Sequence, residues 1–169
     1  MYCKVLWKLW RVWCKLLANR VPLVRRAAIG ALLSLVGAAT VSAAPLDLSP
    51  FRGRVVYLDF WASWCGPCRQ SFPWMESLQK AYEAQGLTVL AINVDHDRPD
   101  ADRFLKIFHP DFEIRFDPQG SWAEEFKVSG MPASVIIDRH GVVRFTHVGF
   151  WPAQGDLSAQ QIRQLLAEH

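Results

Sequence analysis

The stretch Trp61-Ala62-Ser63-Trp64-Cys65-Gly66-Pro67-Cys68 decides how this 169-residue chain folds. It directly follows residues 55–61, a short run of β-formers that is apolar on both faces apart from Asp59. That pattern predicts a central strand that is covered on both sides. Pro67 then opens a helical stretch that we expect to end at Gly86. Two cysteines are therefore expected at the junction between a buried strand and a helix.

The start of a helix suits the chemistry of a reactive thiol. Free backbone N–H groups and the helix dipole stabilise an anion there, and a thiolate is the nucleophile in disulfide exchange. The two residues between the cysteines allow Cys68 to reach back to a mixed disulfide at Cys65. We therefore expect Cys65 to be the exposed attacking thiol and Cys68 the more buried resolving thiol, with a disulfide between them in the oxidised state.

The rest of residues 44–169 alternates between strand and helix patterns. This order predicts an α/β domain with a mixed sheet and helices on both faces. Pro73 inside the first helix should kink it. The further elements that we expect are strands at 87–94 and 112–116, helices at 100–108, 121–127 and from Ser158 onward, and a β-hairpin of 133–137 with 142–148.

Residues 1–43 differ from the remainder in charge. They hold seven of the 19 Lys and Arg residues and none of the 16 Asp and Glu residues. Residues 44–169 therefore carry a net charge of −4, which gives no reason to expect nucleic acid as a partner. We predict two parts, a basic N-terminal segment at 1–43 and a folded domain at 44–169.

The N-terminal segment has the layout of a secretory signal peptide. Arg25-Arg26 precede an apolar run that ends in the small residues Val41-Ser42-Ala43. Cleavage after this run is favoured over an uncleaved membrane anchor, because a spanning helix needs about 20 strongly apolar residues. Residues 1–20 are unusually rich in Trp, so they form either a basic amphipathic helix on a membrane surface or a stretch that precedes a true start near Val21, which we favour.

The cysteine motif resembles the active site of thioredoxins, and other segments resemble the exported TlpA/ResA-like branch of that superfamily. Gly130-Met131-Pro132, which precedes an expected strand, is similar to the family's cis-proline loop. The resemblance covers most of residues 46–168 and implies a thioredoxin fold. It also implies that Pro132 lies against the cysteines in a cis peptide and that a bound substrate contacts Trp64, Gly66, Pro67 and Met131. From the residues alone, Pro132 could instead be an ordinary strand-start proline, and Trp64 and Met131 could serve packing.

Asp59 departs from the TlpA-like pattern, which often has asparagine there, as Ser71 departs from a frequent glutamate. Asp59 instead matches the buried aspartate of thioredoxins, six residues before the first cysteine. The resemblance implies that Asp59, with its pKa raised by burial, takes the proton of Cys68 as that thiol attacks. The alternative is a polar residue that is merely tolerated in the strand.

Other uses of a C-x-x-C motif fit this chain poorly. A structural zinc site needs four ligands, and no second cysteine pair lies in residues 44–169. A haem attachment motif requires histidine where Arg69 stands. We therefore predict neither a metal nor a small cofactor.

Together these features predict an exported thiol–disulfide oxidoreductase of the periplasm or cell envelope. Its substrates would be protein thiols and disulfides, and the resemblance implies a reductant that is fed by a membrane-embedded electron donor and acts in cytochrome c maturation. Residues 1–43 could tether it to the membrane. Two alternatives stay open, a disulfide oxidase or isomerase, and a thioredoxin-fold binding module or chaperone without redox turnover.

Overall fold

The computed structural model describes residues 44–168. Three predictions concern residues outside this range or at its edge and stay predictions. They are the signal peptide or anchor, the start near Val21 and the boundary after residue 43. The elements in chain order are η1 (Ser49–Phe51), β1 (Val55–Trp61), α2 (Cys68–Tyr82), η2 (Glu83–Gln85), β2 (Leu87–Asn93), α3 (Arg98–Phe108), β3 (Glu113–Phe116), α4 (Ser121–Glu125), β4 (Ala133–Ile137), β5 (Val143–Val148) and α5 (Pro152–Ala167).

A five-stranded sheet in the order β3-β2-β1-β4-β5 forms the centre of the domain. Strand β1 runs parallel to β2 and antiparallel to β4, so the predicted mixed sheet is confirmed. All seven residues of β1 are buried, as expected for a strand that is covered on both faces. In the register of the sheet, Asp59 lies between Ala91 of β2 and Ser134 of β4.

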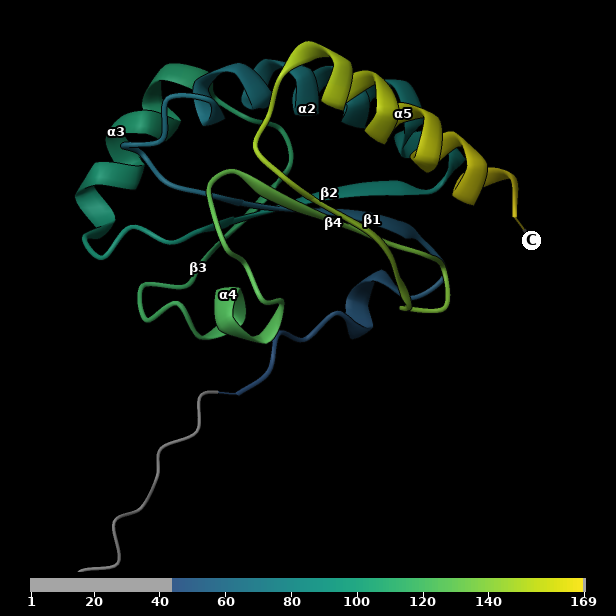
Figure 1. Cartoon of the computed structure of the whole chain (residues 1–169), viewed down its shortest axis with the longest axis horizontal. Coiled ribbons are helices and arrows are strands. Elements are labelled where there is room, and N and C mark those ends of the chain that lie inside the picture. The colour runs from purple at the N-terminus through teal and green to yellow at the C-terminus, as the bar shows by residue number, and fades with distance from the viewer. Residues whose placement is uncertain (1–43, 169) are drawn as a thin grey trace, which may run out of the picture. The chain divides into compact units, whose positions relative to one another are not determined.

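Helices cover both faces of the sheet, as predicted. Helices α2, α3 and α5 lie on one face, whereas α4 and the N-terminal turn η1 lie on the other (Figure 1). Alternate residues of β1 serve the two cores, because successive side chains of a strand point to opposite faces. Tyr57 and Trp61 belong to the core under α2, and Leu58 and Phe60 belong to the core over α4.

An aromatic cluster fastens α2 and α3 to the sheet. The ring of Phe72 in α2 lies 4.8 Å from the rings of both Trp61 and Phe104, measured between centroids. It also lies 5.5 Å from the rings of Phe108 and Phe112. Edge-on and tilted aromatic pairs at these distances contribute beyond the area that they bury. The cluster holds the first turns of α2, which begin at Cys68, against α3.

Two helix starts differ from the prediction. Helix α3 begins at Arg98, two residues early, and α5 begins at Pro152, six residues before Ser158. Pro152 follows an extended cap residue, a position at which proline favours helix initiation. Gly155, although glycine disfavours helix, is a buried residue within α5. The other predicted elements agree with the structure to within two residues.

Within residues 44–168 no helix is both long enough and apolar enough to cross a lipid bilayer.

We expect Gly155→Val to lower the free energy of unfolding by about 1–3 kcal/mol, the usual penalty for overpacking a core. A Cβ atom at Gly155 would lie 2.9 Å from Nε1 of Trp74 and 3.4 Å from Cζ of Phe150. Denaturant unfolding of the oxidised protein measures the change. The matched control is Gln160→Val at an exposed site of the same helix, and an equal loss there would show that packing under Trp74 is not the cause.

Candidate active site

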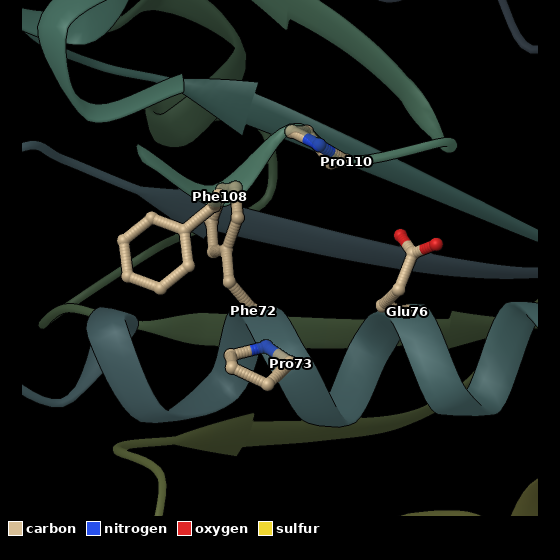
Figure 2. A pocket seen from close by; sticks show the side chains of 5 residues that line it. All are labelled: Phe72, Pro73, Glu76, Phe108 and Pro110. Atoms are coloured by element: carbon tan, nitrogen blue, oxygen red, sulfur yellow. The ribbon is translucent and has the colours of Figure 1, made fainter. Parts of the chain in front are cut away.

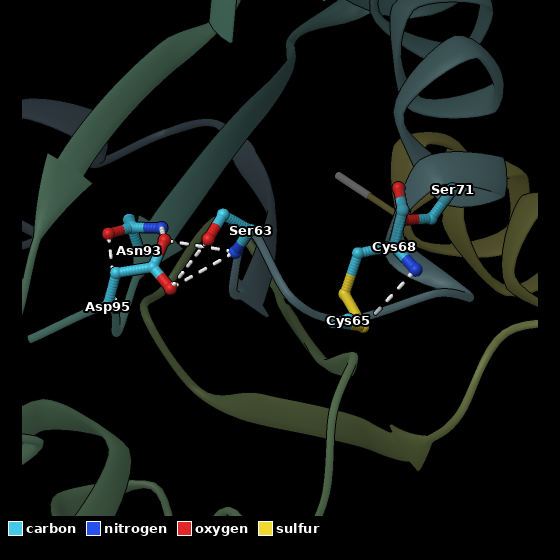
Figure 3. Close-up of a disulfide and its surroundings, with 6 residues drawn as sticks. All are labelled: Ser63, Cys65, Cys68, Ser71, Asn93 and Asp95. Atoms are coloured by element: carbon cyan, nitrogen blue, oxygen red, sulfur yellow. Dashed lines mark hydrogen bonds between the residues drawn. A yellow bond between two sulfur atoms is a disulfide. The ribbon is translucent and has the colours of Figure 1, made fainter. Parts of the chain in front are cut away.

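The cysteine pair lies in the turn that joins β1 to α2. Cys65 and Cys68 form a disulfide, with their Cα atoms 5.3 Å apart (Figure 3). The N–H group of Cys65 donates to the carbonyl oxygen of Ala62 at 3.1 Å, which closes the turn. The N–H group of Cys68 points at the sulfur of Cys65, at 3.2 Å. Helix α2 begins only at Cys68, so Cys65 lies just before the helix. The N-terminal end of the helix interacts with the sulfur of Cys65 through the N–H group of Cys68.

The two cysteines differ in exposure in the predicted order, but only slightly. Cys65 is 3% exposed and Cys68 is fully buried. The prediction of an openly exposed Cys65 is thus wrong for the disulfide form. Its neighbours Trp64, Gly66 and Pro67 are exposed, so a partner that reaches Cys65 has to contact them.

Asp59 is an unpaired carboxyl group in the core. It is 1% exposed, and its Oδ2 atom has no hydrogen-bond partner. Burial raises the pKa of this carboxyl well above its ordinary value. The residues two before and two after it, Tyr57 and Trp61, belong to the core under α2, so Asp59 faces the same side of the sheet as Cys68. Burial and the nearby charge of Asp59 also raise the pKa of Tyr57.

Pro132 lies at the same end of the sheet as the cysteine turn. The next residue, Ala133, pairs with Phe60 of β1, one residue before that strand ends. The peptide bond between Met131 and Pro132 is cis. Pro132 is buried, and its carbonyl oxygen accepts the N–H group of Gly149 at 2.7 Å. Met131 is half-buried and packs against both cores, which is the packing role considered above as the alternative to substrate binding. Part of its side chain is still exposed.

Asp95 is a site residue that the sequence reasoning missed. Its carboxylate accepts the N–H group of Ser63 at 2.9 Å, the hydroxyl of Ser63 at 3.1 Å and the side-chain amide of Asn93 at 2.8 Å. Figure 3 shows these bonds between the end of β2 and the loop that leads to Cys65. The positions of these residues in the sequence could have indicated the contact. Asn93 ends β2 and Ser63 follows β1, and the carboxyl ends of two neighbouring parallel strands lie at the same edge of a sheet.

Two hollows flank helix α2. One lies beside the cysteine turn and is lined by residues of that turn, of α2 and of α3, among them Trp64, Arg69 and Ile107. The other lies further along α2 and is lined by Phe72, Pro73, Glu76, Phe108 and Pro110 (Figure 2). Only the first adjoins the cysteines. Across residues 44–168, no group of three or more His, Cys, Asp or Glu side chains is arranged to hold a metal ion.

Comparison with known families agrees with this geometry. The Redoxin family matches residues 20–161, which is most of the chain. The chain belongs to the Redoxin family. Thiol-disulfide oxidoreductase ResA of Geobacillus kaustophilus is 35% identical over 97 residues, which are 57% of this chain and 56% of that protein. The thioredoxin-like protein YneN of Bacillus subtilis is 37% identical over 65% of each chain.

A solved structure extends the similarity to the fold. A Chlorobium tepidum protein assigned as the thiol:disulfide interchange protein DsbE is 50% identical, with a TM-score of 0.70 over 72% of this chain and 86% of that one. These findings confirm the predicted resemblance to ResA-like oxidoreductases and the predicted thioredoxin fold. This Redoxin-family chain matches a little over half the length of the ResA proteins.

We expect Asp59→Asn to stabilise the protein at neutral pH by about 1–3 kcal/mol, since it removes a buried ionisable group without a partner. Below about pH 4, Asp59 is protonated in the folded and unfolded states, and the two proteins should be equally stable. As the pH rises above that value, the unfolded state ionises first, so the wild type loses stability until the raised pKa of the folded state is passed. Denaturant unfolding at several pH values measures this gap. A gap that is independent of pH, or one shared by the exposed Asp97→Asn, would contradict the assignment.

We expect Asp95→Ala to destabilise the protein by about 1–3 kcal/mol, because it leaves donors of the half-buried Ser63 and the buried Asn93 without this acceptor. Hydrogen exchange of the Ser63 amide should become faster, and denaturant unfolding gives the loss. Asp97→Ala is the matched control, since this exposed aspartate caps α3 without a side-chain hydrogen bond. Unchanged exchange at Ser63 would show that Asp95 does not hold the loop.

Proposed function

We propose that the protein is a thiol–disulfide oxidoreductase that reduces protein disulfides in the periplasm or cell envelope. The observation that carries the proposal is the disulfide between Cys65 and Cys68 at the junction of a buried strand and a helix. The N–H group of Cys68 is aimed at the sulfur of Cys65, which favours a thiolate at Cys65 in the reduced protein. The names of the ResA relatives support the same activity.

The two cysteines divide the reaction between them. The thiolate of Cys65 attacks one sulfur of a substrate disulfide, the other sulfur leaves as a thiolate, and a mixed disulfide forms. Cys68 then attacks the sulfur of Cys65, which releases the second substrate thiolate and forms the disulfide that the structure contains. The substrate gains two electrons, and a dithiol donor must return them to the protein.

Asp59 supplies the base for the second step in this proposal. Cys68 is fully buried and must lose its proton before it attacks. Asp59 faces the same side of the sheet, and burial raises its pKa, which makes its carboxylate a stronger base than that of an exposed aspartate. Pro132 and Met131 at the same end of the sheet, with Trp64, Gly66 and Pro67 around Cys65, would form the surface that holds the substrate.

The sequence and the relatives support the reducing direction and the location of the protein. Gly66 and Pro67 between the cysteines are the pair found in reducing thioredoxins, which the chain resembles. The signal-peptide pattern in residues 1–43 supports export, with cleavage favoured over a membrane tether. A membrane-embedded electron donor and a role in cytochrome c maturation are consistent with the ResA relatives.

The reduction potential of the Cys65–Cys68 pair tests the direction. We expect a value near that of thioredoxin, about −270 mV, rather than near that of the oxidant DsbA, about −120 mV. Equilibration against a thiol buffer, followed by alkylation and mass spectrometry of the peptide that holds both cysteines, measures it free of Cys3 and Cys14. A potential near the oxidant's would make the protein a disulfide donor.

The division of roles predicts opposite behaviour of two variants. Cys68→Ser should accumulate a mixed disulfide between Cys65 and a substrate, because the resolving thiol is gone. Cys65→Ser should accumulate none, and both variants should lose at least about 10³-fold in turnover of a protein disulfide. Mass spectrometry of alkylated samples identifies the adduct. Trapping at Cys68 would reverse the roles, and binding without any turnover by the wild type would favour a chaperone.

A further inference from the structure

The hollow beside the cysteine turn has a chemical character that the redox reaction does not need. We call it the α2–α3 groove, and its lining includes Trp64, Arg69, Asp100, Arg103, Phe104 and Ile107. Two of these side chains are large, apolar and exposed, Trp64 at 71% and Ile107 at 63%. Exposed apolar side chains that are grouped at a site mark a surface for binding a partner.

The groove is also locally basic. Arg103 is paired with Asp100 of the same helix. Arg69 is exposed and makes no ion pair with any residue in 44–168, and its guanidinium group lies 5.4 Å from the ring centre of Phe104. Two guanidinium groups and one carboxylate therefore line the groove, in a domain whose net charge is −4. A positive site on a negative domain favours an anionic partner.

The position of the groove links it to the substrate. Trp64 directly precedes Cys65, and Arg69 directly follows Cys68. The residues next to a substrate cysteine that is bonded to Cys65 can therefore reach this groove. The opposite wall is closely packed, because Phe104 of α3 is 2% exposed and belongs to the aromatic cluster.

We propose that the α2–α3 groove binds the substrate polypeptide beside its cysteine, and that Arg69 and Arg103 select segments in which an acidic side chain accompanies an apolar one. The acidic group would lie between the guanidinium groups, and the apolar group would cover Trp64 and Ile107. The basic N-terminal segment of this chain is a poor occupant, since its seven cationic side chains would meet cations there. This inference rests on the proposed function and adds the class of substrate.

The test uses the full chain with Cys3→Ser and Cys14→Ser, so that Cys65 and Cys68 are the only thiols. Three substrates are compared in single-turnover reduction. The first is bis(2-hydroxyethyl) disulfide, a small neutral molecule. The other two are peptides with one cysteine capped by 2-mercaptoethanol, identical except that leucine is followed by glutamate in one and by lysine in the other.

We expect the glutamate peptide to be reduced about fivefold to tenfold faster than the lysine peptide at low salt, with the ratio approaching one at high salt. Arg69→Glu and Arg103→Glu should abolish or invert the ratio. Because the ratio is taken within each variant, a change in the reactivity of Cys65 cancels. Lys106→Glu makes the same charge change on α3 outside the groove and should keep the wild-type ratio.

A separate variant tests the apolar contact that we propose with Ile107. Ile107→Ser should weaken the preference of the protein for leucine over serine at the peptide position next to the acidic residue, and leave the charge ratio in place.

The outcomes separate the two proposals. Reduction of the neutral disulfide with equal rates for the two peptides would overturn the groove and leave the oxidoreductase intact. A ratio that falls as much in Lys106→Glu as in Arg69→Glu would also overturn it, because overall charge would then set the preference. Failure to reduce even the neutral disulfide would overturn the proposed function itself.

Discussion

The complete burial of strand β1 is the constraint on which the rest of the domain depends. Its seven residues are covered on both faces and paired on both edges, so the strand has one register and one direction. The chain therefore leaves it at Trp61 in a fixed place and enters the cysteine turn there. Parallel pairing with β2 brings Asp95 to the loop at Ser63, and antiparallel pairing with β4 brings Pro132 to the same end. Strand β1 and its two neighbours, β2 and β4, therefore position the reactive turn.

The same strand carries the group that fits worst in a hydrophobic core. Asp59 is buried in the core with an oxygen that has no partner, and burial raises its pKa. A buried carboxyl group of this kind costs stability unless it is protonated, and such groups concentrate at functional sites. Its place on the face of the sheet that α2 covers relates that cost to the buried thiol of Cys68. The core of this domain thus combines close packing with one site that is unfavourable for folding and useful for proton transfer.

Helix α3 connects the core to the surface around the cysteines. Phe104 and Phe108 on one side of the helix join the aromatic cluster around Phe72, while Arg103 and Ile107 stay exposed beside Trp64. One short helix therefore supports the active-site helix and lines the approach to it. The approach is apolar and basic although the domain as a whole is acidic, so local charge rather than net charge describes what it can bind.

Local patterns in the sequence were enough to predict the strand at 55–61, the cysteine turn, the active-site helix and the hairpin of β4 and β5, because neighbouring residues determine these features. The amphipathic pattern predicted α5 only from Ser158 onward, whereas in the structure the helix starts at Pro152 and Gly155 lies close to Trp74. The contact of Asp95 with Ser63 and the groove between Trp64, Arg69 and α3 join residues that are more than 30 positions apart in the chain. Such contacts arise from strand order and helix packing, so the sequence determined the reactive motif and the tertiary structure decided what surrounds it.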